Sequence, residues 1–128
     1  MQNEETLLGI YRVIDLADEK GVYCGKLFAD YGADVIKIEP PQGDIIRSRG
    51  PFFHDEVHPE KSLYWLHFNT NKRSTTLNLE HEQGRNILKR LIKTADVLIE
   101  TFPPGYMKNL GLDYEALKGI NPGLVMCS

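Results

Sequence analysis

The sequence predicts an α/β fold: a Rossmann-like parallel sheet with flanking helices. Short β-branched apolar runs alternate with stretches of helical periodicity, and glycine or proline separates each from the next. The 128 residues match the usual size of one domain, and 41% hydrophobic with 26% charged residues is typical of a globular chain. We therefore expect a single domain over residues 1–128.

The first part of the chain predicts a strand–helix–strand unit, which is the building block of a parallel sheet. Residues 12–16 are apolar and β-branched, as in a buried strand. Residues 21–31 carry apolar side chains four positions apart, and Gly32 follows where a helix needs a left-handed last residue. Residues 34–39 form the second expected strand, which Pro40 ends.

The middle of the chain predicts a long loop and then a third strand. Residues 40–60 hold four of the seven prolines, and loops of this length are usually functional or disordered. Residues 63–68 are aromatic and apolar and are not assigned to an element. The polar turn 69–73 precedes residues 74–79, which alternate and are β-branched as in a strand.

The last part continues the alternation. Apolar pairs four residues apart predict a helix over 82–94, and the apolar run 96–100 predicts a strand. Two short helices, 106–110 and 114–118, are expected before a last strand at 124–127. The abrupt apolar end suggests a piece of a larger fold.

Composition excludes several classes of function. With 15 basic and 18 acidic residues the net charge is −3, which argues against nucleic-acid or membrane-surface partners. The polar start is no signal peptide, and no apolar run could span a bilayer. Two isolated cysteines fit a reducing compartment, so we expect a cytoplasmic protein. The four histidines have no ligand spacing, so no metal is expected.

The turn after the first strand resembles a dinucleotide fingerprint only weakly. Gly21 and Gly25 are four apart and the third glycine is missing, whereas the fingerprint needs three glycines for the tight turn and the approach of the pyrophosphate. Close packing of helix on sheet explains both glycines better. NAD is therefore not expected as a cofactor.

Two other segments could bind a ligand. The run 69–74 has two amides and two cations that could cradle a phosphate, although an exposed turn explains it equally well. Phe102 follows a strand at the edge where α/β sheets bind ligands, so its ring could pack on an adenine or plug the core. No nucleophile–base set is defined by spacing alone.

Several motifs in one order resemble the class III CoA-transferases (CaiB/BaiF), the family that includes formyl-CoA transferase and the α-methylacyl-CoA racemases. The resemblance covers residues 8–128. The motifs are Gly32-Ala-Asp-Val-Ile-Lys-Ile-Glu-Pro-Pro41, Gly43-Asp44, Arg47, Asn69-x-Asn-Lys-Arg-Ser74, Gly84-Arg85, Ala95-Asp-Val-Leu-Ile-Glu100, Phe102-x-Pro-Gly105, Leu110-Gly-Leu112, Tyr114, Leu117 and Asn121-Pro-x-Leu-Val125.

This resemblance implies a large Rossmann-like domain that binds coenzyme A or acyl-CoA, a smaller second domain, and a homodimer of interlocked chains. In the transferases an aspartate attacks the acyl-CoA to give an acyl-aspartyl anhydride, from which a carboxylic acid and a new thioester arise. We expect the parent protein to move CoA between an acyl-CoA and a carboxylic acid. The alternatives are an α-methylacyl-CoA racemase fragment and a non-catalytic CoA-binding or assembly module.

The resemblance also implies binding residues. The positions that would contact CoA are Lys20, Gly21, Asn71, Lys72, Arg73 and Phe102. Lys108 is added as the substitute for an arginine that the family often has where this chain has Asn109. Pro40 stands where the oxalate-linked enzymes have arginine, which argues against that substrate. No catalytic residue is expected in this chain, because the family's aspartate lies downstream and no aspartate here stands at its motif. The 128-residue chain alone should therefore be inactive.

Overall fold

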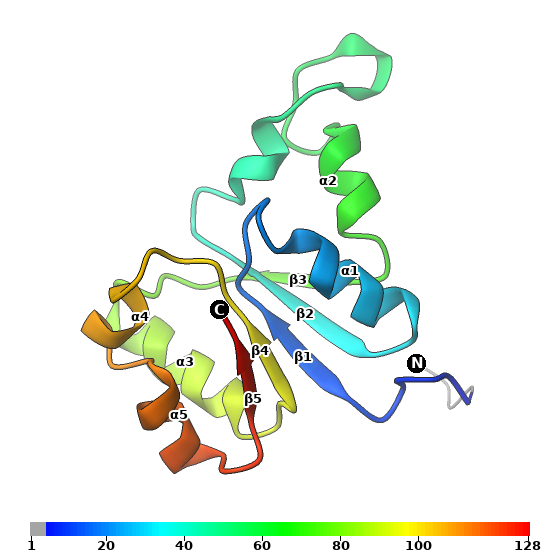
Figure 1. The fold of residues 1–128 in the computed structure, drawn as a ribbon. Helices are drawn as coiled ribbons and strands as arrows, with labels where there is room; N and C mark the ends of the chain where they lie inside the picture. The colour runs from blue at the N-terminus through cyan, green and yellow to red at the C-terminus, as the bar shows by residue number, and fades with distance from the viewer. Residues whose placement is uncertain (1–4) are drawn as a thin grey trace.

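The structure, a computed structural model, describes residues 5–128. Five strands form one sheet in the order β3-β2-β1-β4-β5, and every neighbouring pair is parallel (Figure 1). The strands are β1 (Arg12–Asp15), β2 (Asp34–Glu39), β3 (Arg73–Thr76), β4 (Val97–Ile99) and β5 (Val125–Cys127). The predicted α/β fold with a Rossmann-like parallel sheet is confirmed.

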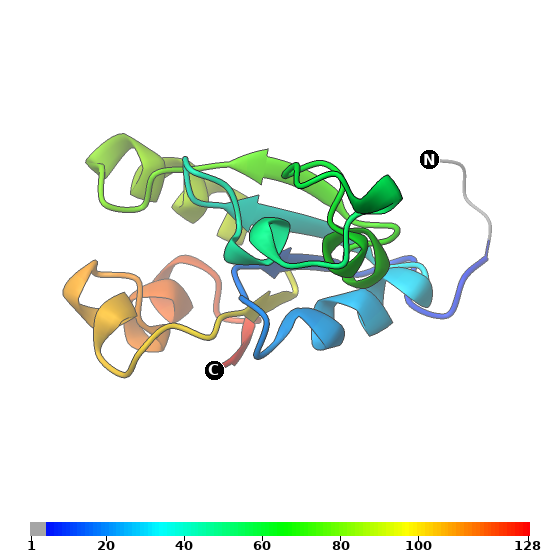
Figure 2. The same cartoon turned by 90° about the horizontal axis from the view of Figure 1, so that it is seen from above.

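Helices cover both faces of this sheet. One face carries α1 (Val22–Asp30), with α2 (Leu63–Phe68) packed beside it, and the other carries α3 (Glu82–Ile92), α4 (Tyr106–Asn109) and α5 (Tyr114–Ile120) (Figure 2). Local signals fix several helix ends. Ser62 Oγ accepts a hydrogen bond from the Trp65 amide at 3.1 Å, and Gly32, with φ +100°, lets the chain leave α1.

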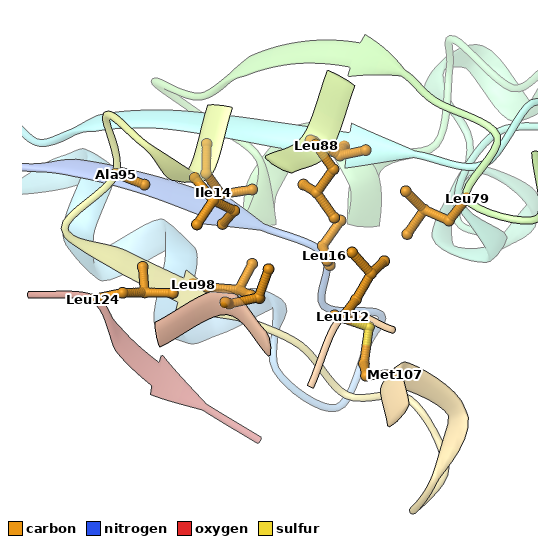
Figure 3. Packing of buried hydrophobic residues seen from close by; sticks show 12 residues of the cluster. Ile14, Leu16, Leu79, Leu88, Ala95, Leu98, Met107, Leu112 and Leu124 are labelled. Carbon is orange, nitrogen blue, oxygen red and sulfur yellow. The ribbon is translucent and has the colours of Figure 1, made fainter. Parts of the chain in front are cut away.

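The main apolar core lies between the sheet and helices α3 to α5. Ile14, Leu88 and Leu98 are fully buried there, and Leu112 and Met107 close the cluster near the end of β4 (Figure 3). Large aliphatic side chains fill this layer because each helix presents an apolar stripe to a sheet face that is itself apolar. The core therefore extends to the edge of the sheet where the strands end.

The segment between β2 and α2 is ordered rather than a featureless loop. It contains the two 3₁₀ turns η1 (Ile45–Ser48) and η2 (Phe53–Asp55). Ile46 is fully buried and packs with Val22 and Trp65, so this segment is anchored to both α1 and α2.

Two elements differ from the sequence predictions. Residues 63–68, which periodicity left unassigned, form helix α2 behind the Ser62 cap. The strand expected at 74–79 is β3 at 73–76, because Leu77 and Leu79 leave the sheet to pack against the main core. The other predicted helices and strands are present, with ends that shift by one or two residues.

Candidate functional site

A pocket of about 380 Å³ opens at the carboxyl ends of the strands. Four segments that follow β1, β2, β3 and β4 line it: Leu16 and Asp18, Ile38 to Ile45, Leu77 to Glu80, and Phe102 with Tyr106. Leu16, Ile38 and Leu79 also belong to the main apolar core, so the pocket has an apolar floor. Its volume lies in the range of small-molecule sites, which is roughly 300–1,000 Å³.

An aromatic pair forms one wall of this pocket. The rings of Phe102 and Tyr106 lie 4.6 Å apart between centroids and are tilted by 33°. The Tyr106 hydroxyl donates a hydrogen bond of 2.5 Å to Glu80 Oε1. Burial together with this hydrogen bond raises the pKa of Tyr106 to about 12, so the hydroxyl remains a donor at neutral pH. The wall therefore has an apolar ring surface and one fixed carboxylate.

Glu39, at the end of β2, is held by Arg47. The guanidinium Nε and Nη2 donate to the two carboxylate oxygens at 2.6 and 2.9 Å, and Ser74 Oγ donates at 2.6 Å. Burial alone would raise the pKa of Glu39, but these hydrogen bonds from Arg47 and Ser74 lower it to about 2. Arg47 also lies 3.8 Å from the Trp65 ring centroid, which joins the pocket wall to α2.

Asp18 lies where β1 turns toward α1. It accepts hydrogen bonds from Lys20 Nζ and Thr101 Oγ1, both at 2.8 Å. Burial opposes these contacts, but the Lys20 and Thr101 hydrogen bonds prevail and lower the pKa of Asp18. The turns after β1 and β4 are therefore tied together at the pocket.

Beside the pocket, four charged side chains form a buried network. Lys72 Nζ lies 2.8 Å from Asp15 Oδ2, and Lys37 Nζ lies 3.7 Å from Asp15 Oδ1 and 3.1 Å from Asp44 Oδ2. Lys37 also donates to the Ala17 carbonyl. The side chains of Lys72 and Asp15 are 1% and 0% exposed, so each charge depends on its partner.

The network requires a glycine on α1. A Cβ at Gly25 would lie 2.2 Å from Asp15 Oδ2 and 3.0 Å from Lys72 Nζ. Lys72 also donates to the Val22 carbonyl at 3.1 Å and to Asn69 Oδ1 at 3.0 Å. Burial lowers the pKa of Lys72, and the Asp15 carboxylate opposes that shift. Gly25 thus serves close packing, as the alternative to the dinucleotide fingerprint predicted.

The structure pairs the three polar-turn residues with aspartates that do not line the pocket. Lys72 is in the buried network, and Arg73, at the start of β3, binds Asp34 at the start of β2 through contacts of 2.7 to 3.0 Å. Asn71 has φ +64°, and its amide donates to Asp30 at 3.0 Å. None of the three side chains lines the pocket.

Of the other predicted binding residues, Phe102 lines the pocket, whereas Lys20, Gly21 and Lys108 do not. Lys20 touches it indirectly through Asp18. Gly21 packs the start of α1 against the turn after β4, since a Cβ there would lie 2.7 Å from the Thr101 methyl carbon. Lys108 is exposed, about 200° around α4 from Tyr106, and therefore points elsewhere.

Sequence reasoning did not single out Tyr106 or Glu80 as site residues. Only the fold brings Glu80 to Tyr106. Within residues 5–128, no three histidine, cysteine or acidic side chains gather as a metal site. The same described residues contain no helix of the length and apolar character that crossing a bilayer demands.

The fold and the pocket define a class of protein. Strand order reverses between β1 and β4, and in open α/β sheets such a switch point is where ligands bind, outside the carboxyl ends of the strands. The segments that follow these two strands form part of the pocket lining, together with residues at and after the carboxyl ends of β2 and β3. The chain is therefore an α/β domain of Rossmann type with a pocket at its switch point.

Comparison with known proteins identifies the family. The model of CoA-transferase family III matches residues 8–128, and the chain belongs to this family. It is 44% identical to the succinyl-CoA:(R)-benzylsuccinate CoA-transferase subunit BbsE of Thauera aromatica, over 92% of this chain and 29% of that protein. It is 41% identical to the succinate–glutarate CoA-transferase of Agrobacterium fabrum, over 100% of this chain and 33% of that protein.

Solved structures agree. A crystal structure of a CaiB/BaiF family protein from Brucella suis superposes with a TM-score of 0.89 at 43% identity, over 98% of this chain and 33% of that one. The crystal structure of the protein Rv3272 of Mycobacterium tuberculosis superposes with a TM-score of 0.84 at 35% identity, over 97% of this chain and 33% of that one. The chain thus spans about a third of the length of these relatives and matches their N-terminal portion. The predicted family resemblance is confirmed.

Proposed function

We propose that the parent protein transfers CoA between an acyl-CoA and a carboxylic acid, and that this chain supplies the pocket for the nucleoside part of CoA. The pocket at the switch point carries the proposal. Phe102 and Tyr106 offer an aromatic wall on which an adenine ring can pack, and the apolar floor excludes water from it. No NAD and no metal takes part in this proposal.

The aspartates of this chain support a catalytic aspartate elsewhere in the protein. A nucleophilic carboxylate must reach the thioester carbonyl, but Asp15 is fully buried against Lys72, and Asp44 is bound to Lys37. Asp96 accepts a hydrogen bond from the Arg12 amide, and Asp113 caps α5. Each of these four carboxylates has a structural role, which agrees with the family resemblance, and we place the acyl-aspartyl step in the proposal on the family's downstream aspartate.

Transfer is favoured over racemisation and over a purely binding role by the relatives. BbsE and the Agrobacterium protein are both named CoA-transferases. A homodimer is part of the proposal. The exposed apolar side chains of Tyr23 and Leu27 on α1, and of Tyr31 just after it, support the homodimer, since an assembly would cover them. The substrates are an acyl-CoA and a carboxylic acid.

Calorimetric titration with CoA, and with NAD as the control ligand, tests the pocket. We expect CoA to bind and NAD not to bind. Phe102→Ala should weaken CoA binding about tenfold, since a base stacked on an aromatic side chain contributes about 1–3 kcal/mol. Phe53→Ala is the matched control, because Phe53 is exposed and lies outside the pocket. CoA binding that is equal in the two folded variants would refute the assignment of the pocket.

A further inference from the structure

Lys37 is a lysine whose whole side chain lies inside the protein, with 1% of it exposed. It belongs to β2, where its neighbours Ile36 and Ile38 pack with the main core, so Lys37 points to the other face of the sheet, on which α1 lies. Burial of an ammonium group is costly unless the group is paired and hydrogen-bonded. The partners of Lys37 therefore indicate what this residue does.

The ammonium group contacts two segments of the chain that both form part of the pocket. One contact is the carbonyl of Ala17, in the turn after β1, whose neighbours Leu16 and Asp18 line the pocket. The other contact is Asp44 Oδ2 at 3.1 Å, in the segment after β2, and Asp44 itself lines the pocket. Lys37 is not one of the lining residues, so it links two parts of the wall without facing the space between them.

Further hydrogen bonds orient both partners of Lys37. The Ala17 amide donates to Asp15 Oδ1 at 2.9 Å, so Ala17 is held through its amide as well as its carbonyl. Asp44 Oδ1 accepts a hydrogen bond of 2.8 Å from the Ile46 amide, and Asp44 Oδ2 is turned to Lys37. Lys37 therefore bridges two groups that are each fixed in direction.

We propose that Lys37 is a positioning residue of the CoA site: it keeps the turn after β1 and the segment after β2 at the separation that the ligand requires, and it does not touch the ligand. A ligand that meets walls already in place loses less free energy to ordering them, so this link raises affinity. The inference rests on the proposed function, since CoA is the ligand whose affinity Lys37 raises.

The test measures the dissociation constant for CoA by calorimetry at a temperature where each variant is folded, so that a loss of stability alone leaves the constant unchanged. Lys37→Met by itself leaves the Asp44 carboxylate buried without its cation. The variant to use is therefore Lys37→Met/Asp44→Asn, which removes both charges and should bind CoA about tenfold more weakly than the wild type. Asp44→Asn alone, in which Lys37 retains the Ala17 carbonyl, should lose no more than about threefold.

Lys26→Met controls for the loss of a lysine as such. Lys26 pairs with Asp30 at 3.0 Å on α1 and neither residue lines the pocket, so the affinity for CoA should stay within about twofold of the wild type. A folded double variant that binds CoA as tightly as Asp44→Asn does overturns the role of Lys37 while the proposed function stands. A wild-type protein that does not bind CoA overturns the proposed function and this inference with it.

Discussion

The two faces of the sheet are stabilised by different interactions. Under α3, α4 and α5 the core consists of large apolar side chains, among them Leu88, Ile92 and Leu98. Under α1 the apolar contacts are made mostly by small residues such as Ala29 and Ala33, and the space beside them holds the network of Asp15, Lys37, Asp44 and Lys72.

The difference shows how one sheet can combine stability with a binding edge. Apolar packing tolerates substitution in proportion to the volume lost, whereas a buried charge is tolerated only while its partner is present. The apolar face continues into the pocket floor through Leu16 and Leu79, and the charged face fixes the turns that surround it through Asp44 and the Ala17 carbonyl. Changes on the two faces should therefore have different signatures.

The largest effect is expected from Lys72→Met. It should lower the free energy of unfolding by about 3–5 kcal/mol, because the Asp15 carboxylate stays buried without its closest cation. Denaturant titration measures this loss. The double variant Asp15→Asn/Lys72→Met removes both charges and should be less destabilised than the sum of its two single variants. Strictly additive losses would show that the pair is not coupled and would remove the contrast between the faces.

A second effect should appear at low pH. The pKa of Glu39 is lowered from 4.5 to about 2, so its contribution to stability is complete above pH 4.5 and is lost as the pH falls toward 2. The shift corresponds to a stabilisation on the order of 3 kcal/mol. Between pH 6 and pH 2.5 the free energy of unfolding should therefore change less in Glu39→Gln than in the wild type. Parallel pH profiles in the two proteins would contradict the stabilisation of the Glu39 carboxylate by Arg47.

The apolar face was the part of the fold that sequence patterns could predict. Residues 82–94 carry apolar side chains at helical spacing, and α3 spans Glu82–Ile92. Helix α2 was missed because six consecutive residues, most of them aromatic or apolar, show no clear period. Its usable signal was Ser62, a residue type preferred at the start of helices.

The charged face could not be predicted in the same way. The sequence shows that Lys72 and Arg73 are cations in a polar turn, but Asp15 and Asp34 lie 57 and 39 positions away. Only the parallel pairing of β1, β2 and β3 brings these partners together. The cations of the turn predicted a phosphate site because their acidic partners cannot be seen in the sequence. Phe102 lines the pocket, as its place after a strand predicted.

Arg73 should produce the smallest effect and completes the contrast with its neighbour. Its side chain is 65% exposed where it binds Asp34, and exposed ion pairs contribute about 0–1 kcal/mol. Arg73→Ala should therefore cost less than 1 kcal/mol in denaturant titration, although it removes the same charge as Lys72→Met one position away. CoA affinity should also stay within about twofold of the wild type, because Arg73 lies at the opposite end of β3 from the pocket-lining segment. A tenfold loss of CoA affinity would instead return Arg73 to the binding site that the family resemblance implied, and would place a phosphate of the ligand at the amino ends of the strands.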